Sequence, residues 1–257
     1  MEKILTTFSH QEAVATITLN HPKGNVLDRT MMGELLKTLH NFKDNHSLKL
    51  IIFEGAGDHF SYGASVEEHQ KEHVAGMLKS FHQVFYELIE LSIPALAKIS
   101  GFCLGGGLEL ALMCNFLFAE QGARLGQPEI VLGVFPPPAS VLLPLKIGYA
   151  RAEELLLTGK TVSAQEAQNL GLLNNVFPDP ESLTAGVENF IEQHILPKSA
   201  SSLRFGVKAA RNGFNETVKT GLALLEKFYV EELMETHDAN EGIAAFIEKR
   251  TPQWTNS

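Results

Sequence analysis

The sequence predicts an α/β protein in which parallel strands alternate with helices. Short runs rich in branched apolar residues, typical of buried strands, lie at 13–19, 48–54 and 95–100. Between these runs, over 30–43 and 67–91, apolar side chains recur every three or four residues, which is the period of an amphipathic helix. Strands that alternate with helices in this way favour a mainly parallel sheet.

The second half of the chain continues this pattern and then becomes helical. The expected elements are strands at 115–120 and 173–177 and helices at 151–157 and 164–170. After Pro197 only helices are expected, at 199–212, 216–236 and 240–249. Apolar stripes on these last helices need a surface to cover them. We therefore divide the chain into a core, 1–196, and a C-terminal helical region, 197–257.

Composition narrows the class of protein. The 257 residues are 44% hydrophobic and 20% charged, which is typical of a globular chain. A formal net charge of −9 argues against a nucleic-acid partner. Cys103 and Cys114 lack the spacing of a zinc site, so we expect two buried free thiols and no metal. Neither a signal peptide nor a membrane span is expected, and the predicted location is the cytoplasm.

The segment GFCLGGGLELALMC, at 101–114, is the first candidate for chemistry. Glycines before a helix let a ligand approach the backbone and leave the first amide groups free to bind an anion or a developing oxyanion. Glu109 lies about one turn into this helix, where burial raises the pKa of a carboxyl and the helix start lowers it. The alternative is a glycine-rich turn whose glutamate pairs elsewhere. Neither a phosphate-binding loop nor a dinucleotide fingerprint fits the spacing.

Two further segments offer the same kinds of group. Residues 60–69 again place a glycine and a small residue before a helix, which supplies a second free amide. Residues 126–134 place a second glutamate, Glu129, among apolar residues. Two amide donors and two half-buried carboxyls are suited to chemistry beside a carbonyl, because the donors stabilise an enolate oxygen and the acids move protons.

Taken together and in order, these segments resemble the crotonase (enoyl-CoA hydratase/isomerase) superfamily. The matching motifs are LNHP, FSYGA, IPALAKISG, GGGLELA, GQPE and AAFIEKR, at 19–22, 60–64, 93–101, 105–111, 126–129 and 244–250. The resemblance implies a spiral of ββα units and a C-terminal helical region that packs subunits into a homotrimer or a dimer of trimers. It implies an acyl-CoA thioester as substrate, and no cofactor beyond the coenzyme A carried by that substrate.

The resemblance also implies roles for individual residues. The oxyanion hole would be the backbone amides of Ala64 and Gly106, and Glu109 and Glu129 would be the catalytic acids, with the choice of base left open. Retention of both glutamates favours a hydratase over related isomerases. The implied coenzyme A contacts are Lys23, Tyr62, Ala64, Phe246 and Lys249. The alternative for Lys249 is an ordinary solvated lysine.

Two departures from the family pattern refine the prediction. Ser65 stands where the family usually has an acid, and prolines at 136–138 replace a glycine-rich segment. A proline lacks the amide donor, so we expect Glu129 to lose a partner at Pro137. The polar residues Glu68 and His69 are expected at a solvated helix start, with a proton donor at His69 as the alternative.

The GASVEEH and VFPPPAS segments are similar to family members that hydrate cyclohexa-1,5-diene-1-carboxyl-CoA in anaerobic degradation of aromatic compounds. The expected function is therefore hydration of a cyclic dienoyl-CoA. The alternatives are a general short- or medium-chain enoyl-CoA hydratase or isomerase, and a non-catalytic binding protein with the same fold.

Overall fold

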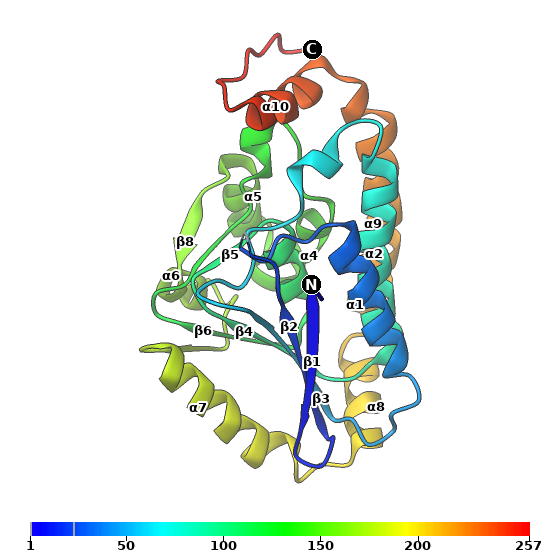
Figure 1. Cartoon of the computed structure of the whole chain (residues 1–257), viewed down its shortest axis with the longest axis vertical. Helices are drawn as coiled ribbons and strands as arrows, with labels where there is room; N and C mark the ends of the chain where they lie inside the picture. The colour runs from blue at the N-terminus through cyan, green and yellow to red at the C-terminus, as the bar shows by residue number, and fades with distance from the viewer. Residues whose placement is uncertain (1, 23) are drawn as a thin grey trace.

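The computed structural model, which describes residues 2–22 and 24–257, contains a six-stranded sheet at its centre (Figure 1). In sheet order the strands are β1 (Ile4–Ser9), β2 (Val14–Leu19), β3 (Leu50–Gly55), β4 (Ala95–Ile99), β6 (Phe116–Glu120) and β9 (Asn175–Phe177). Only β1 runs antiparallel to its neighbour, and the other four pairings are parallel. The predicted parallel sheet is confirmed, whereas β1 was not predicted.

A smaller sheet was also missed by the sequence analysis. It joins β5 (Phe102–Leu104), β7 (Arg124–Gly126) and β8 (Thr161–Ser163), each of three residues. Strands this short carry too few residues to show a period of two. Their pairing matters for the site, because β5 leads directly into the glycine-rich turn.

Helices cover both faces of the main sheet. The α-helices of the core are α1 (Arg29–Asn41), α2 (Val74–Leu91), α3 (Gly106–Met113), α4 (Pro137–Ile147), α5 (Tyr149–Thr158), α6 (Ala164–Asn169) and α7 (Pro180–Phe190). Single turns are formed by η1 (Val66–His69), η2 (Glu129–Leu132) and the π-helical η3 (Ile191–Ile195). The helix predicted at 67–91 thus begins only at Val74, and α4 and α7 were not predicted.

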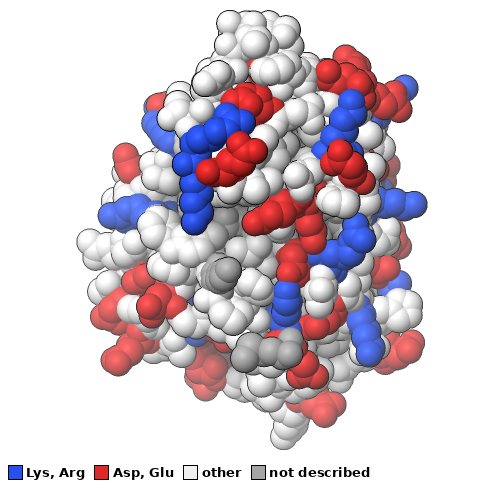
Figure 2. Space-filling model, turned by 45° about the horizontal axis from the view of Figure 1, so that its top comes forward, with Lys and Arg blue, Asp and Glu red and all other residues white. Residues whose placement is uncertain are grey.

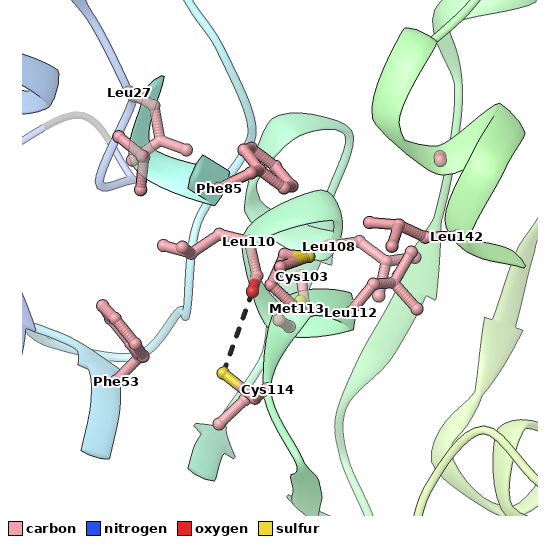
Figure 3. Close-up of a cluster of buried hydrophobic side chains, with 14 of the residues drawn as sticks. Leu27, Phe53, Phe85, Cys103, Leu108, Leu110, Leu112, Met113, Cys114 and Leu142 are labelled. Atoms are coloured by element: carbon pink, nitrogen blue, oxygen red, sulfur yellow. Dashed lines mark hydrogen bonds between the residues drawn. The ribbon is translucent and has the colours of Figure 1, made fainter. Parts of the chain in front are cut away.

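The side chains around α3 form the centre of the larger core. All eight residues of α3 are buried, and Figure 3 shows Leu108, Leu110 and Leu112 of this helix in one cluster with Phe85 and Leu142. Cys103 and Cys114 are free and buried, as expected. A second cluster lies between the opposite face of the sheet and α7.

Cations lie at the C-terminal end of α3. Arg211 donates to the carbonyl oxygens of Met113 and Cys114, and Lys146 Nζ donates to that of Cys114 at 3.1 Å. These donors bind carbonyls that the end of a helix leaves unpaired, and their charge opposes the negative end of the helix dipole.

The C-terminal helices pack on the core. They are α8 (Ala200–Ala210), α9 (Asn212–Glu231), the turn η4 (Leu233–Glu235) and α10 (His237–Glu248). α9 lies against α2 and α4, while α10 lies at the top of Figure 1 and contacts η1 and η2. η1 therefore packs against α2 and α10, and η2 packs against α5 and α10.

Two further observations concern the charge of the surface and the apolar content of the helices. Figure 2 shows acidic and basic side chains interleaved on the visible face, without a continuous basic area. Within residues 2–22 and 24–257, no helix combines the length and apolar content that crossing a bilayer requires.

Candidate active site

Two free backbone amides face each other at the start of α3. Gly105 precedes the helix with φ +49°, a conformation that favours glycine. Among the described residues, neither Ala64 N nor Gly106 N donates a hydrogen bond to another part of the chain. A methyl group placed on Gly106 would lie 3.1 Å from Ala64 N, so the two turns are in direct contact. The predicted pair of amides is therefore brought together.

The turn that carries Ala64 is held by its neighbours. Leu27 N donates to Gly63 O at 2.9 Å, and Ser65 N donates to Leu27 O at 3.1 Å. Gly63 N donates to Ser61 Oγ at 3.0 Å. Because the amides on both sides of Ala64 are paired, the Ala64 amide is left to a ligand in a fixed position.

Glu109 lies one turn into α3 and is 4% exposed. Its Oε1 accepts a hydrogen bond of 2.9 Å from Ala139 N, at the start of α4. Burial raises the pKa of Glu109 well above its usual range, the charge of Glu129 raises the pKa further, and the Ala139 hydrogen bond lowers it. The surroundings of Glu109 therefore favour the protonated form of its carboxyl.

Glu129 opens η2 on the other side of the glycine turn. A methyl group on Gly105 would lie 2.5 Å from Glu129 Oε1, so this carboxyl packs directly on the glycine backbone. The buried Gln127 amide, oriented with its nitrogen toward Glu129, donates to both carboxylate oxygens at 3.2 and 3.0 Å. Burial raises the pKa of Glu129 to about 7.

One cavity of about 610 Å³, including its open mouth, connects these groups. The predicted residues that line it are Tyr62, Ala64, Gly106, Glu109 and Glu129. Its remaining wall is largely apolar and includes Leu78, Phe81, Leu132, Phe135 and Pro136–Pro138. The arrangement can polarise a carbonyl at the amides while two carboxyls act on a neighbouring carbon.

Two predicted coenzyme A contacts lie outside the cavity, and a third, Lys23, falls outside the described residues. Phe246 and Lys249 are exposed at the end of α10 and do not line the cavity. Their expected role in a neighbouring subunit stays a prediction.

The proline run acts on a different glutamate from the one expected. Pro137 and Pro138 are the first two residues of α4, where a helix needs no amide donor. The first available amide, that of Ala139, binds Glu109, whereas the expected effect concerned Glu129. Since Pro137 and Pro138 have no amide hydrogen, Ala139 supplies the first donor of α4, and this donor binds the carboxyl of Glu109 in α3.

The expectation of a solvated helix start at 65–69 was wrong for His69, which lines the cavity. Glu68 instead accepts hydrogen bonds from Arg29 N at the start of α1, at 3.0 and 3.1 Å. His69 Nδ1 lies 2.8 Å from Ser65 O, four residues earlier, and this bond orients the ring. Only the tertiary fold decides which of these neighbouring polar groups faces the cavity.

Tyr229 was not singled out from the sequence. Its hydroxyl is buried and has no hydrogen-bond partner among the described residues. Burial raises the pKa of Tyr229, and the charges of Glu129 and Glu109 raise it further. Its ring packs on Phe135 at a centroid distance of 5.2 Å, so α9 supports the cavity wall.

Comparison with known proteins agrees with this geometry. The model of the family described as enoyl-CoA hydratase/isomerase matches residues 9–257. The chain belongs to the enoyl-CoA hydratase/isomerase family. The expectations of a crotonase-type α/β fold and of an enzyme with hydratase chemistry are thereby confirmed at the level of the family.

Individual family members are also similar. The chain is 43% identical to a cyclohexa-1,5-dienecarbonyl-CoA hydratase of Thauera aromatica, over 93% of this chain and 92% of that protein. It is 36% identical to a probable enoyl-CoA hydratase of Mycobacterium bovis, over 95% of both chains. A crystal structure of an enoyl-CoA hydratase from Bacillus anthracis superposes with a TM-score of 0.78 at 32% identity, covering 99% of this chain and 100% of that one.

Proposed function

We propose that this enzyme adds water to a conjugated acyl-CoA thioester, converting cyclohexa-1,5-diene-1-carboxyl-CoA to 6-hydroxycyclohex-1-ene-1-carboxyl-CoA. The observation that carries the proposal is that two unpaired amides, Ala64 N and Gly106 N, share one cavity with two carboxyls of raised pKa. Each amide that binds the developing enolate oxygen contributes about 3 to 4 kcal/mol at the transition state.

The surroundings of the two carboxyls support a different role for each. Glu129, whose pKa burial raises to about 7, takes the proton of the attacking water as base. Burial and the charge of Glu129 raise the pKa of Glu109 and favour its protonated form, so Glu109 orients that water and supplies a proton to the α-carbon when the product of attack is a simple enolate. Attack at the β-carbon forms the C–O bond while the π electrons move to the oxygen held by the amides.

The cyclic substrate is supported by the identity to the Thauera aromatica hydratase and by the shape of the wall. Phe81, Phe135 and the prolines offer flat apolar surfaces to a six-membered ring. In a cyclic dienoyl thioester the negative charge extends to the γ-carbon, and protonation there gives the 1,4-addition product. Such a reaction belongs to anaerobic degradation of aromatic compounds by way of benzoyl-CoA.

A second candidate is hydration of linear enoyl-CoA thioesters. It is supported by the 36% identity to the Mycobacterium bovis protein, a probable enoyl-CoA hydratase whose name specifies no cyclic acyl group. Parallel assays with crotonyl-CoA and with the cyclic dienoyl-CoA, followed by mass spectrometry of the products, separate the two. Fast hydration of crotonyl-CoA without turnover of the cyclic thioester would overturn the cyclic assignment.

The catalytic assignment has its own test. We expect Glu129→Gln to lower kcat on every accepted thioester by about 10³-fold or more, since the general base is lost. The exposed Glu153→Gln serves as the matched control and should retain wild-type turnover. Unchanged turnover in Glu129→Gln would refute the assigned role of this carboxyl and favour a binding protein or another mechanism.

The proposal includes a homotrimer or a dimer of trimers. Large apolar side chains on the C-terminal helices, among them Leu224, Phe228 and Phe246, are exposed in the single chain. Light scattering coupled to size-exclusion chromatography tests this: a monomeric mass at micromolar concentration contradicts the proposed assembly.

A further inference from the structure

His69 adds a third acid–base group to the cavity that holds Glu109 and Glu129. It ends η1, five residues after the amide of Ala64, and lines the same cavity as both glutamates. The lining of this cavity also includes the apolar residues Val66, Met77 and Leu78. A thioester bound at the two amides would share the cavity with the imidazole.

The hydrogen bond to Ser65 determines which nitrogen is available. A carbonyl oxygen only accepts hydrogen bonds, so the contact of 2.8 Å between Ser65 O and Nδ1 places the proton of the neutral ring on Nδ1. Nε2 therefore carries a lone pair. Within the described part of the chain it has no hydrogen-bond partner, and it is not among the fully buried polar atoms. Burial lowers the pKa of His69 and so favours the neutral ring over the imidazolium.

The proposed reaction needs such a group. Water bonds to the β-carbon of the ring, but the proton is delivered to the γ-carbon, on the far side of the six-membered ring. Glu109 and Glu129 both contact the glycine turn or its helix, beside the carbonyl. A separate acid over the γ-carbon removes the need for one carboxyl to serve both sides of the ring.

We propose that His69 Nε2 exchanges the proton of the γ-carbon, so that His69 is a further catalytic residue specific to cyclic dienoyl thioesters. This inference rests on the proposed function. In the dehydration direction, neutral Nε2 takes the γ-proton, the electrons move to the oxygen at the amides, the C–O bond breaks, and Glu129 protonates the departing hydroxide. In hydration, His69 and Glu129 together begin with one proton, which is on His69. Glu129 takes a proton from water, and the imidazolium of His69 protonates the γ-carbon.

The test compares two substrates and two positions. His69→Gln keeps a polar side chain that cannot bind a proton near neutral pH, and His69→Met removes polarity altogether. His73→Gln, in the same loop but exposed and outside the cavity, is the matched control. Each variant is assayed with the cyclic dienoyl-CoA and with crotonyl-CoA. The hydroxylated cyclic product is also incubated with each enzyme in D₂O, and NMR follows deuterium entering at the γ-carbon.

We expect both His69 variants to lower kcat on the cyclic thioester and the rate of γ-deuteration by about 100-fold or more, while KM and crotonyl-CoA hydration stay within about threefold. Equal losses on both substrates would indicate a structural role and overturn the inference, as would unchanged γ-deuteration. Circular dichroism identifies a variant that fails to fold. In that case the kinetics and γ-deuteration of the other His69 variant test the inference. A wild-type enzyme that hydrates crotonyl-CoA but not the cyclic thioester overturns the proposed function itself, which is a distinguishable result.

Discussion

The first turns of α3 and α4 lie at the same site but differ in how many free amide donors they offer. α3 begins after Gly105 with unpaired amides that no side chain caps, whereas α4 begins with Pro137 and Pro138, which have no amide hydrogen. The first helix start keeps its donors for a ligand. The second removes two of its donors, and its first remaining donor is bound to Glu109 inside the protein.

The difference shows how one type of local structure can serve either a substrate or a catalytic side chain. A helix start concentrates partial positive charge, which stabilises negative charge wherever the free amides point. In the proposed mechanism, the charge at α3 acts on the transition state. At α4 it acts on Glu109 and partly offsets the rise in pKa that burial causes. Four predictions break or sharpen this comparison.

The largest effect is expected at the carboxyl that links the two helices. Glu109→Gln removes the proton that Glu109 gives to an α-carbon, so crotonyl-CoA hydration should fall by about 10³-fold. The cyclic thioester should lose less activity, because its proton arrives at the γ-carbon from His69. Steady-state kinetics on both thioesters measures the contrast, and an equal loss would argue that Glu109 supplies both protons.

The next effect comes from giving α3 a start like that of α4. Gly106→Pro removes one oxyanion donor, and kcat should fall by about 10²- to 10³-fold. Gly106→Ala keeps the donor but adds a methyl group 3.1 Å from Ala64 N, so it measures the steric part of the change. If the alanine variant loses as much activity as the proline variant, the donor at this position is not what matters.

A smaller effect is expected when α4 loses the hydrogen bond that Ala139 N donates to Glu109. Ala139→Pro removes the hydrogen bond that lowers the pKa of Glu109. The pKa then rises further, so the neutral form persists to higher pH and the alkaline limb of the kcat profile moves to higher pH. A shift toward lower pH would contradict the assigned sign. The acidic limb, which reports the ionisation of Glu129 near pH 7, should stay in place.

The smallest effect is expected from restoring one donor to α4. Pro138→Ala adds an amide at the second helical position without removing the bond from Ala139 to Glu109. Activity should change by less than about threefold, and the free energy of unfolding should fall by about 0.4 to 1 kcal/mol because the unfolded chain gains freedom. Urea unfolding followed by circular dichroism gives this value. A large loss of activity would mean that the proline shapes the cavity directly.

These helix starts also show what sequence patterns can predict. The glycines before Glu109 predicted free amides because glycine leaves the backbone open and no side chain competes for the donors. The prolines at 136–138 were interpreted only as the loss of an amide donor to Glu129. Proline is tolerated at the first positions of a helix, and α4, which begins at Pro137, was not predicted. Periodicity identified the long buried strands, but the three-residue strands β5, β7 and β8 depend on pairing between distant segments.

His69 illustrates a limit of a different kind. Its neighbours Glu67 and Glu68 are also polar, and nothing in the local pattern separates a solvated side chain from one in the cavity. Two hydrogen bonds make the difference. His69 Nδ1 is bound to Ser65 O, and the carboxylate of Glu68 accepts a hydrogen bond from Arg29 N. Both contacts arise only after the loop has folded against its surroundings.

The contact between α10 and the turns η1 and η2 has a practical consequence for enzyme engineering. One C-terminal helix supports both the segment that ends in His69 and the segment that begins with Glu129. At Gly242 a methyl group would lie 2.1 Å from Leu132 O, so a larger residue there must displace η2. We therefore expect a larger residue at Gly242 to change the cavity wall, and with it the range of accepted thioesters, through η2 rather than through the amides of Ala64 and Gly106.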